Sequence, residues 1–249
     1  MLDNHVSIGG IMPYINIYGH KISTYSFFIG LAIISAVLVY IYDNKRSGEL
    51  KNGDAITVVI SAFFFGAVGS KIPILIIHFN EIITNPLLLA SGKSIVGGLV
   101  GGYIGVIVIK KIKHIKTKFG NNIAKAIALG MGIGRLGCFL GGCCYGKVAI
   151  WGLGIDFGDG LPRYPTQLIE LIFCFGLFVY LEKIKPNVVE PGKLFKILLN
   201  SYLIFRFFIE FIRDNEVFYM GITYYQIICL VCLLVVNKRT IIQNYRKLF

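Results

Sequence analysis

One arginine is set apart by its surroundings, which are apolar and rich in glycine. The segment 130–146 reads GMGIGRLGCFLGGCCYG and carries Arg135 near its middle. A guanidinium at membrane depth costs roughly 2.5–3.5 kcal/mol on insertion scales, so such a side chain faces a partner or a wet cavity. Guanidinium binds phosphate through two parallel hydrogen bonds, and closely spaced glycines let a headgroup approach the backbone. The chemistry predicted for this stretch is recognition of an anionic lipid.

A second group of polar residues lies on a later apolar stretch. Tyr202, Arg206 and Glu210 follow one another at intervals of four residues, which places them on one face of a helix. One interpretation is an intrahelical ion pair that lowers the insertion cost of both charges. The other is a face lining a cavity, where Arg206 binds phosphate and Glu210 orients it or accepts a proton. The spacing leaves both interpretations open.

Three of the six cysteines, Cys138, Cys143 and Cys144, cluster beside Arg135. A neighbouring guanidinium favours the thiolate, so Cys143 is a candidate reactive group. Packing as small buried hydrophobic residues is the competing interpretation. No histidine accompanies the cluster and its spacing lacks a C-x-x-C pair, so we expect no metal site.

These side chains must be positioned by membrane helices, because the composition is that of a membrane protein. Hydrophobic residues make up 55% of the 249 residues, charged residues 15%, and the mean hydropathy is +0.71. Apolar stretches recur at lengths near the 20 or so residues that cross a bilayer. We therefore expect an all-α membrane protein with seven transmembrane helices, at Thr24–Tyr42, Ala55–Phe79, Ile95–Ile109, Ile123–Cys144, Thr166–Leu181, Leu194–Ile212 and Tyr219–Val236.

The net charge of +12 is distributed unevenly between alternate loops. One side of the expected membrane holds 15 Lys and Arg residues: Lys45, Arg46, Lys51, five lysines in 110–118, Lys183, Lys185, Lys193, Lys238, Arg239, Arg246 and Lys247. The other side holds 5: Lys21, Lys93, Lys147, Arg163 and Arg213. This positive-inside pattern predicts an outer N-terminus and a cytoplasmic C-terminus, and it argues against nucleic-acid binding.

No cleavable signal peptide and no soluble domain are expected. The chain is expected to form a single polytopic domain over 1–249, with short extracytoplasmic segments near 1–23 and 146–165. Residues 10–24 are expected to form a strand or an interfacial piece that leads into the first span. Lys125 and Lys196, near the ends of spans, are expected to extend towards lipid headgroups.

The order of these motifs resembles that of the prolipoprotein diacylglyceryl transferases, a family of seven-span bacterial membrane enzymes. The resemblance runs from about Tyr25 to Gln226. The matching motifs are Gly97-Gly98-Leu99-Val100-Gly101, Gly134-Arg135-Leu136-Gly137-x-Phe139, Arg163-Tyr164-Pro165-Thr166-Gln167-Leu168-Ile169-Glu170, the set Tyr202, Arg206, Glu210 and Arg213, and Gly221 to Gln226.

The resemblance implies a reaction and a substrate. Members of the family move a diacylglyceryl group from phosphatidylglycerol to the lipobox cysteine thiol of a prolipoprotein, in the bacterial plasma membrane. It implies a prolipoprotein signal peptide as acceptor and no cofactor. Together with the residue chemistry it predicts Arg135, Arg206, Glu210 and Cys143 as catalytic residues, and Tyr25, Gly97, Gly98, Gly142, Gly146 and Tyr202 as substrate-binding residues.

The chain departs from the family pattern at several polar positions. Val96 stands where a histidine usually precedes the Gly-Gly-Leu. In the signature around Arg135, Cys138 and Gly141 replace asparagines and Cys143 replaces a glutamate. A divergent paralogue that uses an anionic lipid with another acceptor, and a membrane thiol oxidoreductase, are the alternatives. The acceptor, the general base and the oligomeric state stay open.

Overall fold

The computed structural model describes residues 10–48, 52–86, 94–115, 120–150 and 152–248, apart from the side chains of 52, 55 and 239–248. The chain forms two compact units, each built from segments far apart in the sequence. The first comprises Met1–Glu49, Lys118–Leu198 and Ile209–Asn215, and the second Leu50–Thr117, Leu199–Phe208 and Glu216–Phe249.

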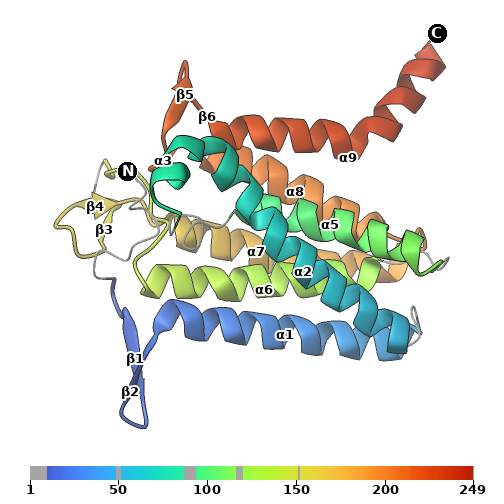
Figure 1. Cartoon of the computed structure of the whole chain (residues 1–249), viewed down its shortest axis with the longest axis horizontal. Coiled ribbons are helices and arrows are strands. Elements are labelled where there is room, and N and C mark those ends of the chain that lie inside the picture. The colour runs from blue at the N-terminus through green and yellow to red at the C-terminus, as the bar shows by residue number, and fades with distance from the viewer. Residues whose placement is uncertain (1–9, 49–51, 87–93, 116–119, 151, 249) are drawn as a thin grey trace. The chain divides into compact units, whose positions relative to one another are not determined.

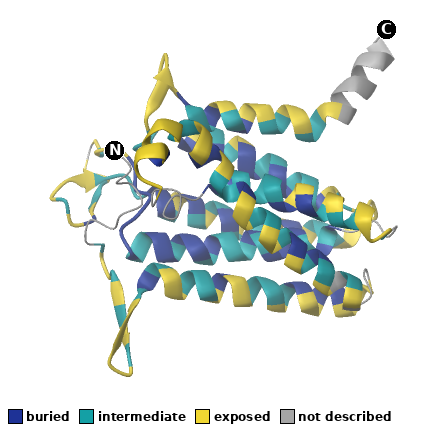
Figure 2. Cartoon of the chain, viewed as in Figure 1, coloured by how far each residue is buried: buried dark blue, intermediate teal, exposed yellow. Residues whose placement is uncertain are grey.

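Three long helices form the first unit, α1 (Thr24–Ser47), α6 (Asn121–Leu140) and α7 (Thr166–Ile184) (Figure 1). The helix α6 packs against both α1 and α7, and it carries more buried residues than either (Figure 2). The smaller elements are β1 (Tyr14–Ile17), β2 (His20–Ser23), β3 (Ile155–Asp156), β4 (Pro162–Arg163), the 3-10 turn η2 (Lys185–Asn187) and the first part of α8 (Lys193–Ile209).

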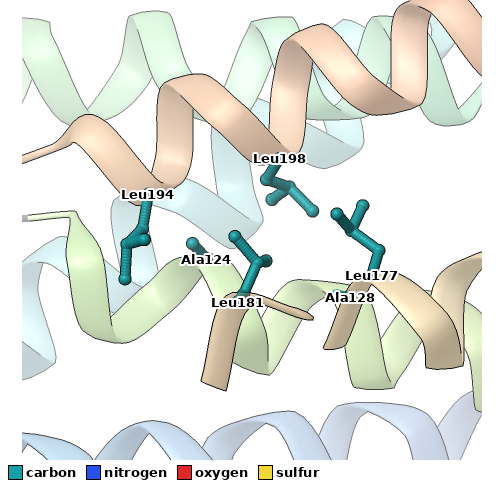
Figure 3. Close-up of a cluster of buried hydrophobic side chains, with 6 residues drawn as sticks. All are labelled: Ala124, Ala128, Leu177, Leu181, Leu194 and Leu198. Carbon is teal, nitrogen blue, oxygen red and sulfur yellow. The ribbon is translucent and has the colours of Figure 1, made fainter. Parts of the chain in front are cut away.

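A cluster of alanines and leucines joins α6 to α7 and to the start of α8. Each helix contributes two residues four positions apart, which therefore lie on one helix face. The small side chains on α6 leave room for the leucines of the other two, as Figure 3 shows. The six residues are Ala124, Ala128, Leu177, Leu181, Leu194 and Leu198, all buried. Close contact through small residues is the usual way in which helices associate inside a bilayer.

The residues before α1 form a β-hairpin, so of the two forms expected there, a strand or an interfacial piece, the structure has strands. β1 and β2 pair antiparallel, with Ile17 opposite His20. The two residues between them, Tyr18 and Gly19, have φ of 48° and 83°. Positive φ at both central positions is the signature of a type I′ turn, whose twist matches that of the strands.

The second unit contains α2 (Asn52–Ile77), α3 (Phe79–Thr84), α5 (Ile95–Ile112), the rest of α8, β5 (Val217–Tyr219), β6 (Ile222–Thr223) and α9 (Tyr224–Leu248). Glycines bring α2 and α5 into backbone contact. A Cβ atom on Gly69 would lie 2.6 Å from the carbonyl oxygen of Gly97, and one on Gly101 would lie 2.7 Å from the Cα of Gly69. Such distances are tighter than any real Cβ contact, so larger residues would push the helices apart.

Four helices in the described ranges are long and apolar enough to cross a membrane: α1, α5, α6 and the Ile56–Ile77 part of α2. A shorter apolar stretch, Tyr224–Lys238, lies within α9. Many of their large apolar side chains are exposed, as expected for a surface that faces lipid (Figure 2). The expected mostly helical membrane protein is thus confirmed, whereas its seven spans and its orientation stay predictions.

The bounds of the first and the last helix differ from those of the expected spans. α1 begins at Thr24, as expected, but continues to Ser47. The last helix begins at Tyr224 rather than at residue 219, because the β5–β6 hairpin with its Met220-Gly221 turn occupies the preceding residues. Residues 1–9 of the expected outer segment, and Lys51, Lys93, Lys116 and Lys118 of the charge count, lie outside the described residues.

The expectation that Lys125 extends towards headgroups is wrong. Its ammonium group is buried and lies 3.0 Å from a carboxylate oxygen of Asp43, and it also pairs with Glu182. Lys185 lies 2.7 Å from the same Asp43 oxygen. Burial of a lysine is stable when carboxylates compensate its charge, and here α1 and α7 supply them.

Candidate functional site

Four buried charged side chains of the first unit form a continuous series of alternating sign. Arg135 Nη2, on α6, lies 2.7 Å from Glu170 Oε1, in the first part of α7. The other oxygen of Glu170 lies 3.8 Å from Arg213 Nη1, and Arg213 Nε lies 4.0 Å from Glu210 Oε2. Both carboxylates are fully buried and the two guanidinium groups are at most 6% exposed. Their charges balance within the series, which is what makes burial of four ionised groups tolerable.

The segment after α8 supplies the last two members of this series. α8 ends at Ile209, so Glu210 lies in the following turn. Asn215 Nδ2 donates to Glu210 Oε1 at 2.6 Å. The backbone near Arg213 pairs with the chain near Gly146, and Lys147 N donates to Ile212 O at 2.9 Å. The turn is therefore fixed by backbone bonds, which hold both side chains in place.

The start of α7 also holds the loop that follows α6. Gln167 Nε2 donates to the carbonyl oxygen of Cys143 at 2.7 Å, and Thr166 Oγ1 donates to that of Cys144 at 2.8 Å. Gln167 lies one helical turn before the Glu170 that binds Arg135. The same helix therefore positions the loop and the guanidinium.

The three clustered cysteines lie at this loop, beside Arg135. Their sulfur atoms all lie within 4.8 Å of one another, and Cys138 Sγ accepts a hydrogen bond from Arg135 Nη1 at 3.9 Å. Tyr25, near the start of α1, packs against the cluster. Of the residues expected from the sequence, Tyr25, Arg135 and Cys143 are thus brought together.

Gly142 and Gly146 lie where segments of the protein pack closely together. Gly142 has φ of 68°, and a Cβ there would lie 2.4 Å from the Cα of Gly10. A Cβ on Gly146 would lie 2.5 Å from Ile212 O. Both glycines allow segments of the protein itself to approach closely, so the space that they leave is filled by backbone. Their assignment as substrate-binding residues stays a prediction.

An ion-pair cluster outside the helices braces the neighbouring loops. Arg163 lies between Asp159 and Asp214, with 3.0 Å separating its Nη1 from Asp214 Oδ2, and it stacks over Tyr145 at 4.6 Å. Burial raises the pKa of Asp159, but the hydrogen bond and charge of Arg163 and the hydrogen bond from the Leu161 backbone together outweigh this and hold that pKa below its usual value. Burial would likewise lower the pKa of Arg163, and the hydrogen bond with Asp159 raises it. Asp159 is thus held in place as an ion-pair partner of Arg163.

The other expected residues belong to the second unit. Tyr202 is fully buried, and Arg206 is 6% exposed with its guanidinium 5.5 Å from the centre of the Tyr225 ring. Gln226 Nε2 donates to Phe207 O at 3.2 Å, which ties α9 to this part of α8. Arg206 is thus held by an aromatic face, and its role towards phosphate stays a prediction.

Gly97 and Gly98 differ in what they contact. A Cβ on Gly97 would lie 2.4 Å from Gly69 O and 2.8 Å from the Cδ of Pro73, whereas one on Gly98 would lie 3.5 Å from Gly66 O. We expect Gly97→Ala to lower the free energy of unfolding by about 1–3 kcal/mol through overpacking. We expect Gly98→Ala to change it by less than about 1 kcal/mol, because its contact is an ordinary one.

Thermal unfolding of both variants in detergent tests this pair. Equal unfolding temperatures would contradict the packing argument for Gly97. Loss of lipid-dependent activity in a well-folded Gly98→Ala protein would support the substrate-binding assignment of Gly98.

Two members of the buried series, Glu170 and Arg213, were not among the site residues predicted from the sequence. Both lie within motifs that were recognised, at the end of RYPTQLIE and three residues after Glu210. A carboxylate on an otherwise apolar helix was the available signal, because such a charge needs a partner.

Comparison with known proteins gives one consistent family. The family model described as prolipoprotein diacylglyceryl transferase matches residues 13–239. A phosphatidylglycerol–prolipoprotein diacylglyceryl transferase 2 of Clostridium perfringens is 33% identical over 214 residues, covering 80% of this chain and 82% of its own length. Phosphatidylglycerol–prolipoprotein diacylglyceryl transferases of Clostridium tetani (32% identity, 80% and 84% coverage) and Dehalococcoides mccartyi (29%, 83% and 84%) are also similar. With a match over nearly its whole length, this chain belongs to the prolipoprotein diacylglyceryl transferase family.

Proposed function

We propose that this chain transfers the diacylglyceryl group of phosphatidylglycerol to the lipobox cysteine thiol of a prolipoprotein, in the bacterial plasma membrane. The observation that carries the proposal is the family match over residues 13–239, together with the names of relatives that share about a third of their residues with this chain. The signal peptide of the prolipoprotein is the proposed acceptor segment.

The reaction is an alkyl transfer. The acceptor sulfur forms a bond to the glycerol carbon that carries the phosphate ester, and the bond between that carbon and the ester oxygen breaks. Glycerol phosphate leaves with the bonding electrons, and the thiol gives up its proton. Catalysis therefore needs an aligned thiolate and a stabilised departing phosphate.

Arg135 is the proposed phosphate-binding residue of the first unit. Its guanidinium carries five N–H donors in a planar fork, so it can contact Glu170 and a phosphate at the same time. Glu170 fixes its orientation, and the preformed position lowers the entropy lost on binding. Arg206, in the second unit, stays a proposed phosphate ligand on the chemistry of its side chain.

Glu210 is the proposed proton acceptor. The carboxylate is fully buried, and the hydrogen bond from Asn215 and the charge of Arg213 keep it oriented. A positioned carboxylate can take the thiol proton as the carbon–sulfur bond forms. Cys143 is the second candidate, because its thiol lies in the loop beside Arg135.

We also propose seven spans, formed by α1, α2, α5, α6, α7, α8 and α9, with the N-terminus outside. The support is the division of 15 to 5 between alternate loops. Reporter fusions within residues 110–118 should be active only as cytoplasmic reporters, and fusions near Arg163 only as external ones. Activity of an external reporter fused within residues 110–118 would contradict this topology.

The transfer itself is tested with purified protein, phosphatidylglycerol labelled in its acyl chains, and a synthetic lipobox peptide. Mass spectrometry should show the peptide heavier by one labelled diacylglyceryl group, with one glycerol phosphate released per modified peptide. A peptide with serine in place of its cysteine is the control and should stay unmodified. Consumption of lipid without modification of the peptide would indicate another acceptor.

A further inference from the structure

The three clustered cysteines form a compact group of soft ligands. Cys138, Cys143 and Cys144 are 6–8% exposed, and their sulfur atoms all lie within 4.8 Å of one another. Cys143 N donates to Cys138 O at 3.0 Å, which folds the chain back at the end of α6. The Gln167 and Thr166 side chains hold the next two carbonyl groups. The sulfur positions are therefore set by a network of bonds outside the thiols themselves.

The size of this group is close to that of a metal site. Zinc binds thiolate sulfur at about 2.3 Å, so sulfur atoms around a tetrahedral zinc ion lie about 3.8 Å apart. Starting from separations of at most 4.8 Å, each sulfur would have to move by less than about 0.6 Å. Rotation of cysteine side chains supplies movements of this size without a change in the backbone.

The backbone at Cys144 has an uncommon conformation, which it shares with the turn residues Tyr18, His114 and Met220. This residue has φ of 62°, in the left-handed region that favours glycine. A residue other than glycine there costs roughly 1–3 kcal/mol. The strained conformation brings the third sulfur to the other two.

The chemistry of the ligands selects the ion. In the described part of the chain, this is the one group of histidine, cysteine or carboxylate ligands close enough to hold a metal, and all its members are thiols. Thiolates favour Zn²⁺ and Cu⁺ over harder ions. Three thiolates leave one net negative charge with Zn²⁺ and two with Cu⁺. The guanidinium of Arg135 contacts Cys138 Sγ but is also paired with Glu170, so the smaller residual charge is favoured.

We propose that Cys138, Cys143 and Cys144 bind one Zn²⁺ ion as three thiolates. Binding releases the three thiol protons, and the fourth coordination position takes water or another donor. The ion links the end of α6 to the loop that α7 holds through Gln167 and Thr166. With Cys143 bound to zinc, Glu210 is left as the proton acceptor of the proposed transfer; the inference itself does not depend on that reaction, since it concerns a metal bound by the resting protein.

The metal content of the purified full-length protein tests the proposal. Protein prepared in detergent under reducing conditions and equilibrated with zinc should retain about one zinc ion per chain after gel filtration, measured by elemental mass spectrometry. The Cys138→Ser and Cys143→Ser variants should retain at least about fivefold less zinc. Cys174→Ser is the matched control: this residue is fully buried in α7, outside the group, and its zinc content should equal that of the wild type.

A measurement on the wild type covers the case in which the serine variants fail to fold. Metal-free protein titrated with Co²⁺ should develop the thiolate-to-metal charge-transfer absorption of a cysteine site, and Zn²⁺ should abolish it. Absence of both zinc and the cobalt absorption would overturn the proposal, and so would equal zinc content in all variants. Retention of Cu⁺ against a chelator, with no retention of Zn²⁺, would overturn the assignment to zinc.

Discussion

The Arg135→Lys variant should lose at least about 100-fold of its lipid-dependent transfer rate while it still inserts and folds. Lysine keeps the positive charge beside Glu170, so the buried ion pair survives in a weaker form. It cannot, however, bind a phosphate through two parallel hydrogen bonds while it contacts Glu170. Loss of one donor that stabilises charge in a transition state typically costs a factor of 100–1,000.

The comparison variant for Arg135 is Arg163→Lys. Arg163 also lies between carboxylates, Asp159 and Asp214, but outside the long helices rather than on α6. Transfer by this variant should stay within about threefold of the wild type, because lysine keeps a positive charge between the two carboxylates and Asp214 is partly exposed. The rate at which each variant consumes labelled phosphatidylglycerol measures both effects. Unchanged turnover in Arg135→Lys would remove Arg135 from the site.

The sequence predicted the elements well because they depend on local patterns. The start of α1 at Thr24 followed from the start of a long apolar run, and a strand was one of the two forms expected for the residues before it, where the structure has a hairpin. The importance of Arg135 followed from the cost of a buried guanidinium, and that residue is indeed buried and paired. These inferences need only the neighbours of a residue along the chain.

The ion-pair partners of the buried charged residues could not be predicted from the sequence. Glu170 lies 35 positions from the Arg135 that it binds, and only the packing of α6 against α7 brings them together. Lys125 was expected to reach headgroups, but Asp43 on α1 holds it inside. A sequence shows that a buried charge needs compensation, whereas tertiary packing decides which residue supplies it.

The glycines show the same difference between what the sequence predicts and what tertiary packing decides. Their spacing predicted that a lipid headgroup approaches the backbone, whereas the structure shows close approaches by other segments of the protein. At Gly142 the approaching group is Gly10, more than a hundred residues earlier. At Gly97 it is the backbone of α2. Conformational freedom is visible in the sequence, and the identity of the neighbour is not.

Removal of the charge at Glu170 should destabilise the protein strongly. Glu170 is fully buried between two guanidinium groups, at 2.7 Å from Arg135 and 3.8 Å from Arg213. Glu170→Gln keeps the size of the side chain but leaves Arg135 without its carboxylate. Breaking a buried ion pair by removing one partner costs about 3–5 kcal/mol. Thermal unfolding in detergent should show this as a large fall in unfolding temperature.

Glu182→Gln is the matched control, on the same helix. Glu182 also pairs with a buried cation, Lys125, but its own side chain is 53% exposed. Lys125 keeps Asp43 as a second partner after the change. Loss of this exposed partner should cost no more than about 1 kcal/mol. If the two variants unfold at the same temperature, the series that includes Glu170 is not a buried charge network.

A double variant separates the stability of this network from its chemistry. Arg135→Met combined with Glu170→Leu removes both members of the shortest pair and replaces them by apolar side chains of similar size. Stability should recover to within about 1–2 kcal/mol of the wild type, because no uncompensated charge is left at that pair. Arg213 keeps Glu210 as its partner. Transfer should nevertheless stay abolished, since the proposed phosphate ligand is absent. A double variant that is stable and still active would show that the pair serves the fold alone.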